Sequence, residues 1–232
     1  MIKAVIFDVD GTLVDSNDLH VEAWREAFRC YGKELSFEDV HGQMGKGGDQ
    51  LMPVFCSEEE LEEFGEELEQ KRVELFKSDY LPRVRPFPRV RELFERVKAE
   101  GLQIALASSA KGEELEQHKK SMRVADLLEA ATSADDARRS KPHPDIFQAA
   151  LAGLKEVRPE EAVVVGDTPY DVQAAAKAGV STVGLLSGGF SEEALREAGA
   201  VAVYRDVSEL LERFDESPLA RGRADAAAGS GS

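Results

Sequence analysis

The chain of 232 residues carries 29 basic and 45 acidic residues, for a formal net charge of −16 at neutral pH, and 42% of its residues are hydrophobic. These proportions are typical of a globular protein that buries a substantial core. Because so acidic a surface repels nucleic acid and anionic membranes, we expect neither as a partner. An anionic substrate would need cations supplied by its own site.

The two cysteines, Cys30 and Cys56, have neither the spacing of metal ligands nor that of a redox pair. They are typical of reduced thiols, with a Cys30–Cys56 disulfide as the less favoured alternative. The N-terminal residues show no signal-peptide pattern, and no apolar run is long enough to span a membrane. We therefore expect a cytoplasmic protein. The sequence leaves its oligomeric state open.

The chain begins with the apolar run KAVIFD (residues 3–8), which predicts a buried strand. Residues 16–82 contain no strong strand and predict an inserted, all-helical cap domain with helices at 17–32, 37–44 and 57–80. The last helix is acidic around most of its circumference, which indicates a solvated surface. The glycine-rich stretch GKGGDQ (residues 45–50) predicts a flexible cap loop.

Beyond the linker LPRVRPFP (residues 81–88), apolar runs alternate with amphipathic stretches. The runs lie at 102–108, 128–133, 161–167, 180–186 and, more weakly, 200–206. Such alternation is typical of an α/β fold with a doubly wound parallel sheet. We assign residues 1–15 and 83–215 to this core. Residues 216–232 predict a disordered tail rich in small residues.

Polar and charged side chains follow four of the apolar runs, including the first. They lie at the end of the predicted strand or in the loop that follows it. They are Asp8, Asp10 and Thr12; Ser108 and Ser109; Lys141; and Asp167 and Asp171. Because the carboxyl ends of parallel strands meet at one edge of a sheet, we expect these groups to form one site. A further acid, Asp15, completes a cluster of three aspartates in the stretch VIFDVDGTLVDS.

The donor types of this site favour phosphoryl transfer. Clustered carboxylates need a cation, and hard oxygen ligands from Asp8 and Asp167 select Mg²⁺. Asp8 then attacks phosphorus, and Asp10, on the same face of the strand, exchanges protons with the leaving group and with water. Ser108 binds phosphoryl oxygens, and Lys141 neutralises the phosphate charge.

Four stretches also resemble the four motifs of the haloacid dehalogenase superfamily: DVDGTLVDS, LASS, SKPHPDIF and VVVGDTPYDVQAAAKAG. The inserted helices resemble the small cap of its phosphoglycolate phosphatase and β-phosphoglucomutase branch. The resemblance implies Asp8 as nucleophile, Asp10 as general acid and base, and Ser108, beside Ser109, and Lys141 as phosphate binders. For Mg²⁺ it implies Asp8, Asp167 and the backbone carbonyl of Asp10. Asp171 would bind the metal through water or orient Lys141.

We therefore predict a Mg²⁺-dependent phosphatase that hydrolyses a small phosphorylated metabolite through an aspartyl-phosphate. The alternative is a sugar-phosphate mutase similar to β-phosphoglucomutase. Against it, the mutase cap arginine has only Lys46 as a basic counterpart in its region, and Gly166 stands where mutases tend to carry Glu. A phosphate-accepting, receiver-like module without enzymatic activity is a further alternative. It is disfavoured by Asp10, since receivers lack a proton carrier two residues after the nucleophile.

Several residues keep a structural interpretation beside the functional one. Thr12 fits a turn or a phosphate contact, Ser108 the N-cap of a helix over 110–122, and Asp171 a helix-terminal carboxylate. His20 and Lys46 are candidates for substrate contacts from the cap, whereas Trp24 is expected in the cap core. His41, His118 and His143 show no ligand spacing, so we expect surface or capping roles for them.

Overall fold

The structure is a computed structural model that describes residues 1–220. Its centre is a six-stranded sheet in the order β5-β4-β1-β6-β7-β8, in which every neighbouring pair is parallel. Each apolar run of the sequence forms one of these strands, which confirms the predicted α/β fold. The strands are β1 (Ala4–Phe7), β4 (Gln103–Ala107), β5 (Ala130–Thr132), β6 (Ala162–Gly166), β7 (Ser181–Leu185) and β8 (Ala202–Tyr204).

Helices cover both faces of the sheet, which explains why its strands are continuously apolar. Alternate residues of β1 point to opposite faces: Val5 and Phe7 to one, Ala4 and Ile6 to the other. The first face packs against α5 (Val90–Ala99), α6 (Gly112–Met122) and α10 (Val207–Glu212). The second packs against α7 (Asp145–Ala152) and α8 (Pro169–Lys177), and α9 (Glu192–Ala198) lies beside α8.

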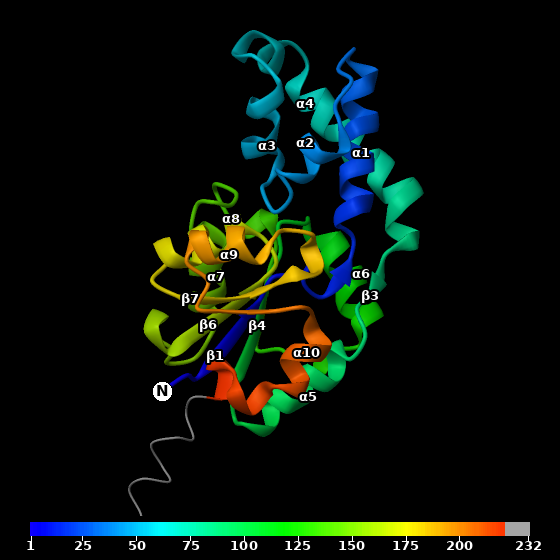
Figure 1. Ribbon diagram of the computed structural model, residues 1–232. Helices are drawn as coiled ribbons and strands as arrows, with labels where there is room; N and C mark the ends of the chain where they lie inside the picture. Colours follow the sequence, from blue (N-terminus) through cyan, green and yellow to red (C-terminus); the bar gives the residue numbers. More distant parts are fainter. Residues whose placement is uncertain (221–232) are drawn as a thin grey trace, which may run out of the picture.

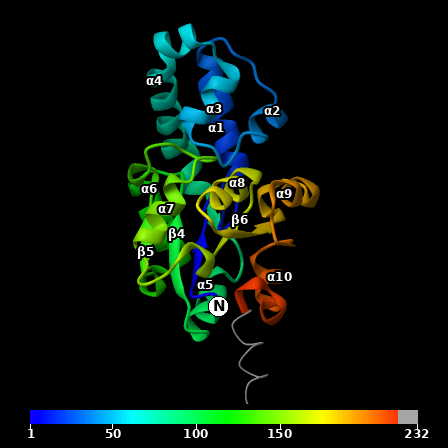
Figure 2. The same cartoon turned by 90° about the vertical axis from the view of Figure 1, so that its left-hand side faces the viewer.

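A separate group of helices stands beyond one end of the sheet, opposite the end that carries the N-terminus (Figures 1 and 2). These helices have their own apolar core, which includes Trp24, Phe28, Leu51 and Leu68. They are α1 (Asn17–Cys30), α2 (Phe37–His41), α3 (Gly48–Phe55) and α4 (Glu58–Leu75), the last continued by a π-helical turn at Phe76–Tyr80. The three expected helices are present, and α3 is an addition. The domain limits at residues 16 and 82 stay a prediction.

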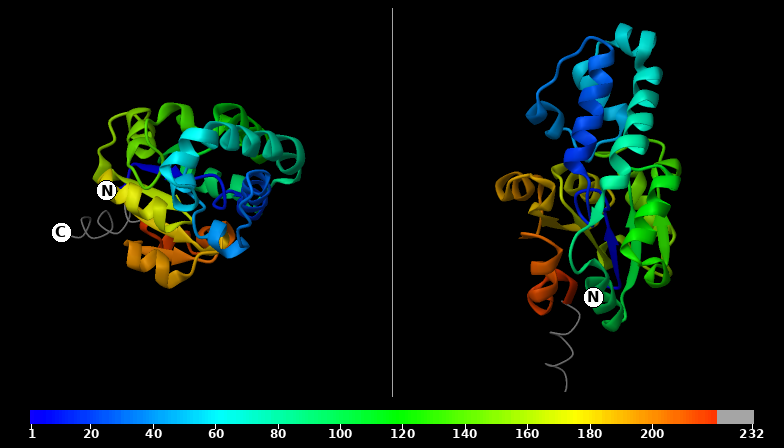
Figure 3. Two further views of the ribbon diagram at one scale, coloured as in Figure 1. Left: turned by 90° about the horizontal axis from the view of Figure 1, so that it is seen from above. Right: turned by 90° about the vertical axis from the view of Figure 1, so that its right-hand side faces the viewer.

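The chain passes between sheet and helices at one place. On the way out it forms β2 (Val14–Asp15), and on the way back a 3₁₀ turn (Leu81–Arg83) and β3 (Arg85–Pro86). β2 and β3 pair antiparallel, so the expected linker contains a short strand. The right-hand view of Figure 3 shows both crossings side by side beneath the helices.

The glycine-rich stretch differs from the expected flexible loop. Its second half is the start of α3, which has Gly47 as N-cap. Its first half packs against the sheet unit so closely that a Cβ on Gly45 would lie 2.5 Å from the Thr168 hydroxyl. The glycines therefore allow a close approach between two parts of the protein.

The expected disorder from residue 216 onwards is wrong for residues 216–220. They form the end of one 3₁₀ turn (Phe214–Glu216) and a second turn (Pro218–Ala220), and the side chain of Leu219 is buried in the main core. Residues 221–232, the rest of that expectation, lie outside the described residues. Further 3₁₀ turns are Ala125–Leu127, Ala134–Asp136, Pro159–Glu161 and Leu186–Gly188.

Two further expectations concern the cysteines and membrane-spanning helices. Cys30 is exposed, Cys56 is buried, and both are free thiols, which confirms that they form no disulfide. Among residues 1–220, no helix combines the length and the apolar character needed to cross a membrane.

Candidate active site

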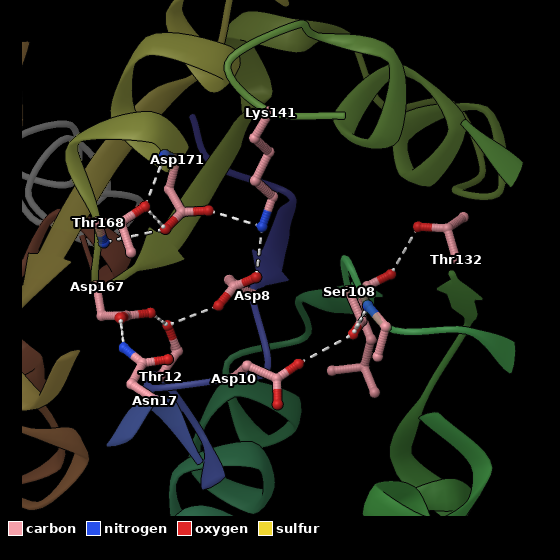
Figure 4. Close-up of polar contacts among 12 residues, drawn as sticks. Asp8, Asp10, Thr12, Asn17, Ser108, Thr132, Lys141, Asp167, Thr168 and Asp171 are labelled. Atoms are coloured by element: carbon pink, nitrogen blue, oxygen red, sulfur yellow. Dashed lines mark hydrogen bonds and ion pairs between the residues drawn. The ribbon is translucent and has the colours of Figure 1, made fainter. Parts of the chain in front are cut away.

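The carboxyl edge of the sheet gathers four buried charged side chains (Figure 4). Asp8 follows β1, Asp167 follows β6 beside it, Asp171 lies in the first turn of α8, and Lys141 precedes α7. The Lys141 ammonium lies 2.5 Å from Asp8 Oδ1 and 2.7 Å from Asp171 Oδ1. Burial disfavours a charged ammonium, but Asp171 and Asp8 raise the pKa of Lys141 above its usual value.

The charges of this edge do not balance without a further cation. Asp8, Asp167 and Asp171 each offer an oxygen within 4.8 Å of the others, and all three are buried beside one ammonium. Burial, opposed by Lys141 and reinforced by Asp171, raises the pKa of Asp8 to about 7. Burial and the neighbouring Asp8 raise the pKa of Asp167 well above its usual value. Hard oxygen donors with excess negative charge fit a divalent cation such as Mg²⁺.

Two side chains near the start of the chain orient Asp167. The Thr12 hydroxyl donates to Asp167 Oδ1 at 2.5 Å and lies 3.1 Å from Asp8 Oδ2. The Asn17 amide donates to Asp167 Oδ2 at 2.9 Å and to the Gly188 carbonyl at 3.2 Å. Thr12 thus joins the two aspartates. The sequence analysis did not identify Asn17. The only feature that pointed to Asn17 was its position directly after the first motif.

Asp10 points to a different set of neighbours than Asp8. The Ser16 hydroxyl donates to Asp10 Oδ1 at 2.7 Å, His20 Nε2 lies 3.3 Å from the same oxygen, and His118 Nε2 lies 3.6 Å from it. Burial favours the neutral acid, but the hydrogen bond with His20, the charge of His118 and the Ser16 hydroxyl hold the pKa of Asp10 below its usual range.

The expectation of a surface or capping role is wrong for His118, whose residue is only 2% exposed. Its neighbour at i−4 on α6, Glu114, faces the same group of side chains, with Oε1 3.6 Å from His118 Nε2. This i, i+4 pair of a carboxylate and an imidazole was the signal that sequence reasoning passed over.

The second motif lies at the end of β4. Ser108 is fully buried, and its Oγ accepts the Ala110 N–H at 3.0 Å and lies 3.5 Å from Asp10 Oδ2. Ser109 lines the cavity described below. The helix that follows begins at Gly112 with Lys111 as N-cap, so Ser108 does not cap it.

Asp171 contacts two neighbouring residues, Thr168 and Lys141. Its Oδ2 accepts the Thr168 N–H at 3.0 Å and the Thr168 hydroxyl at 2.7 Å, which closes a capping box at the start of α8. Its Oδ1 faces Lys141. The geometry therefore fits both the helix-terminal and the lysine-orienting interpretation.

A cavity of about 240 Å³ opens between the sheet edge and the helices above it. Asp8 and Asp10 line it from the sheet, His20 and Arg72 line it from helices α1 and α4, and Lys46 lines it from the turn before α3. Arg72 belongs to α4, which was expected to be a solvated helix, and the Lys46 ammonium lies 4.6 Å from the ring centre of Tyr170. Asp15, the third aspartate of the opening stretch, is exposed on β2 and lies outside the site.

This arrangement of fold and motifs has counterparts in known proteins. Residues 5–185 match the haloacid dehalogenase-like hydrolases, so the chain belongs to that family, as the four motifs predicted. The phosphorylated carbohydrates phosphatase of Thermotoga maritima is 32% identical over 206 residues, which cover 88% of this chain and 94% of that protein.

Solved structures give the same result. A hydrolase from Pseudomonas syringae shares 30% identity with a TM-score of 0.82 and covers 92% of this chain and 98% of its own. The β-phosphoglucomutase of Clostridium difficile shares 25% identity with a TM-score of 0.73 and covers 93% of this chain and 96% of its own. The chain is thus a hydrolase whose relatives include phosphatases, with a mutase among its structural neighbours.

Proposed function

We propose that the protein is a Mg²⁺-dependent phosphatase that hydrolyses a small phosphorylated metabolite through an aspartyl-phosphate on Asp8. One observation carries the proposal. The Asp8 carboxylate, held by Lys141, and the Asp10 carboxylate, held by Ser16 and His20, line one small cavity side by side.

Asp8, Asp167 and the backbone carbonyl of Asp10 would hold Mg²⁺. The support for this ligand set is the excess negative charge of the buried carboxylates, since a dication offsets the charge that Lys141 leaves uncompensated. When bound, the cation would neutralise charge on the phosphoryl group and keep Asp8 and Asp167 ionised.

The reaction then has two steps, formation and hydrolysis of the aspartyl-phosphate, and each includes a proton transfer. Asp8 attacks phosphorus while the bond to the leaving oxygen breaks, and that oxygen takes a proton from Asp10. Because Asp10 is ionised in the free protein, it has to take up this proton when the anionic substrate binds beside it. Asp10 next takes a proton from water, which attacks the aspartyl-phosphate and releases inorganic phosphate and free Asp8. Lys141, Ser108 and Ser109 bind the phosphoryl oxygens as its charge develops.

The cavity supports a small, anionic substrate. Its volume suits a metabolite, and four basic side chains among residues 1–220 line it and can attract an anion to an otherwise acidic protein: Lys46, Arg72, Lys77 and Lys111. The relative that acts on phosphorylated carbohydrates supports that class of substrate. We propose a cytoplasmic location, since such metabolites are found there.

A mutase of sugar phosphates is the second candidate, and Arg72 favours it by placing an arginine over the cavity. Gly166 weighs against it, because a Cβ at this position would lie 2.7 Å from the Asp171 Cβ. A glutamate there would displace the residue that holds Lys141. Incubation with β-glucose 1-phosphate and a bisphosphate primer separates the two, since a mutase yields the isomer and a phosphatase yields free phosphate.

The variant Asp8→Asn tests the nucleophile. We expect turnover of p-nitrophenyl phosphate with Mg²⁺ to fall by about a thousandfold or more, because an amide does not form the phosphoenzyme. Asp15→Asn makes the same change at the exposed aspartate and should leave turnover near that of the wild type. Near-wild-type turnover of Asp8→Asn would refute the proposed function.

A further inference from the structure

Two consecutive glycines, Gly188 and Gly189, lie in the loop that follows β7, and each allows a close contact on a different side. A Cβ on Gly188 would lie 1.8 Å from Oδ2 of Asp167 at the sheet edge. A Cβ on Gly189, which has φ +86°, would lie 2.7 Å from Nε2 of His41, the last residue of α2. The loop is therefore packed between the proposed cation site and the helical unit, where larger residues would force the two apart.

The Gly188 carbonyl accepts hydrogen bonds from His41 and Asn17, and both donors belong to the helical unit. His41 Nε2 lies 3.0 Å from this oxygen, and because a carbonyl only accepts, the imidazole donates through its Nε2–H. The Asn17 amide, at the start of α1, donates to the same oxygen at 3.2 Å and to Asp167 Oδ2 at 2.9 Å (Figure 4). One carbonyl thus connects the position of α2 to the orientation of a proposed cation ligand.

The residues on either side of the two glycines anchor the loop in both parts of the protein. Phe190 follows β7 of the sheet, yet it packs against the apolar core of the helices, and its ring centre lies 5.3 Å from that of His41. The Ser187 hydroxyl donates to the Gly11 carbonyl at 2.7 Å, in the turn after β1. The His41 hydrogen bond is one of several contacts, so its loss should shift the helices rather than unfold them.

The orientation of Asp167 affects how tightly a cation binds. Asp8 and Asp167 offer oxygens within 4.8 Å of each other, and the Asn17 amide helps to hold Asp167 in this position. Groups that orient a metal ligand commonly change the affinity for the metal by about tenfold or more. His41 supports Asn17 through the shared carbonyl, so docking of α2 should strengthen cation binding. Linkage then requires the cation to strengthen docking by the same factor.

We propose that His41 is a positioning residue that couples docking of the helical unit to cation binding, through the Gly188 carbonyl and Asn17. Docking of α2 keeps Asp167 oriented for Mg²⁺, and the helices are held over the cavity more firmly once Mg²⁺ is bound. The protein therefore closes its cavity most tightly when the cation that the reaction needs is in place. The inference rests on the cation site of the proposed function and not on Asp8 as the nucleophile.

Titration with Mn²⁺ in place of Mg²⁺, followed by the electron paramagnetic resonance of the free ion, measures the affinity. His41→Phe keeps a ring and removes the donor, and we expect it to weaken Mn²⁺ binding about fivefold. His41→Gln keeps an N–H donor and should bind within about twofold of the wild type. Tyr80→Phe removes a hydrogen bond to Glu26 inside the helical unit and should leave the affinity unchanged. Unchanged affinity in His41→Phe, or an equal loss in His41→Gln, would overturn the proposal.

A double-mutant cycle tests the route of the coupling. Asn17→Ala should itself weaken Mn²⁺ binding, because Asp167 loses a hydrogen-bond donor. In that background, His41→Phe should add a loss of less than about twofold, since the amide that joins Gly188 to Asp167 is gone. Losses that multiply in the double variant would place the two side chains on separate routes and would contradict the coupling through Asn17.

Hydrogen exchange measures the reciprocal effect without any substrate. Mg²⁺ should slow amide exchange in residues 37–45 of the wild type and leave it unchanged in His41→Phe. The same slowing in both proteins would refute the coupling. Mn²⁺ binding that depends on His41, in a protein that hydrolyses no phosphate ester, would refute the proposed function and leave the coupling standing. A wild type that binds no Mn²⁺ would refute both the coupling and the cation site.

Discussion

Asp8 and Asp10 lie two positions apart in the chain, yet their surroundings shift their pKa values in opposite directions. Asp8 is buried among other carboxylates, and its pKa rises to about 7 despite Lys141. Asp10 accepts hydrogen bonds and lies close to two histidines, so its pKa falls below its usual range despite burial. At neutral pH, Asp8 is therefore only partly ionised unless a further cation binds, whereas Asp10 is ionised.

The raised pKa of Asp8 predicts how pH affects the metal-free protein. The folded state keeps a proton up to about pH 7 that the unfolded chain loses near pH 3.8. Unfolding therefore releases a proton, and the free energy of unfolding falls as pH rises through this window, by up to about 1.4 kcal/mol per pH unit for one carboxyl. Asp167 acts in the same direction.

Urea denaturation at several pH values, with EDTA or with Mg²⁺, measures this effect. Stabilisation by Mg²⁺ should grow as pH rises toward 7, because the cation replaces the lost proton. A Mg²⁺ effect that stays constant across the window would contradict the charge balance described for the three carboxylates.

Asp10→Asn separates the two proton transfers. The p-nitrophenolate group leaves readily without a proton, whereas attack by water still needs a base. We expect rapid release of about one p-nitrophenol per chain, followed by a steady-state rate at least about a hundredfold below that of the wild type. Stopped-flow absorbance measures both phases, and wild-type steady-state turnover would exclude Asp10 as the proton carrier.

At the scale of secondary structure elements, packing overrode two expectations based on composition. The acidic helix α4 was expected to be solvated, yet it buries Leu68 and brings Arg72 to the cavity. The 3₁₀ turn at Pro218–Ala220 lies at the start of a small-residue tail, yet its side chains are buried. In both segments a few apolar residues are enough to attach a polar element to a core.

Leu219→Ala tests the packing of the last turn. Because the Leu219 side chain is buried in the main core, we expect the free energy of unfolding to fall by about 2–4 kcal/mol. Val201→Ala shortens an apolar side chain that is 50% exposed and should change it by less than about 0.5 kcal/mol. Similar urea midpoints for the two variants would mean that the turn contributes little to stability.

At the scale of the whole molecule, the site is completed only where the helical unit meets the sheet unit. Gly45 lies against Thr168, Gly47 lies against Ser140, and the Tyr170 hydroxyl donates to the Gly42 carbonyl at 2.6 Å. These contacts hold the segment that carries Lys46 above the cavity. The position of one unit on the other therefore decides the shape of the space for the substrate.

Gly45→Ala is expected to disturb this position. Gly45 has φ +94°, and an added Cβ would also meet Thr168. Gly32→Ala is the matched control, since Gly32 has φ +76° and nothing lies within 4 Å of the point that its added methyl group would occupy. Both variants should lose about 1–2 kcal/mol of stability through backbone strain.

Only Gly45→Ala should also lower kcat/KM, by roughly tenfold, because it moves cavity residues away from the sheet edge. Steady-state kinetics on the best substrate of a metabolite panel measures the difference. An equal kcat/KM for the two variants would show that the contact with Thr168 does not position the site.

The parallel sheet, the helical character of the inserted segment, and the meeting of Asp8, Ser108, Lys141 and Asp167 at one edge were all predictable from the amino-acid pattern. These features follow from local patterns, since a continuous apolar run predicts a buried strand and the carboxyl ends of parallel strands lie at the same edge of the sheet. The roles of these residues remain a proposal.

The side chains that surround Asp10 and the cavity were not predictable from the sequence and became evident from the packing of the folded chain. His118 and Arg72 are ordinary members of charged helices in the sequence, and Asp15 resembles its two neighbouring aspartates. Their places depend on how α4 and α6 pack and on the turn between β1 and β2, which are contacts between residues far apart in the chain. Local periodicity does not predict such contacts, and these contacts determine whether a histidine is buried or exposed.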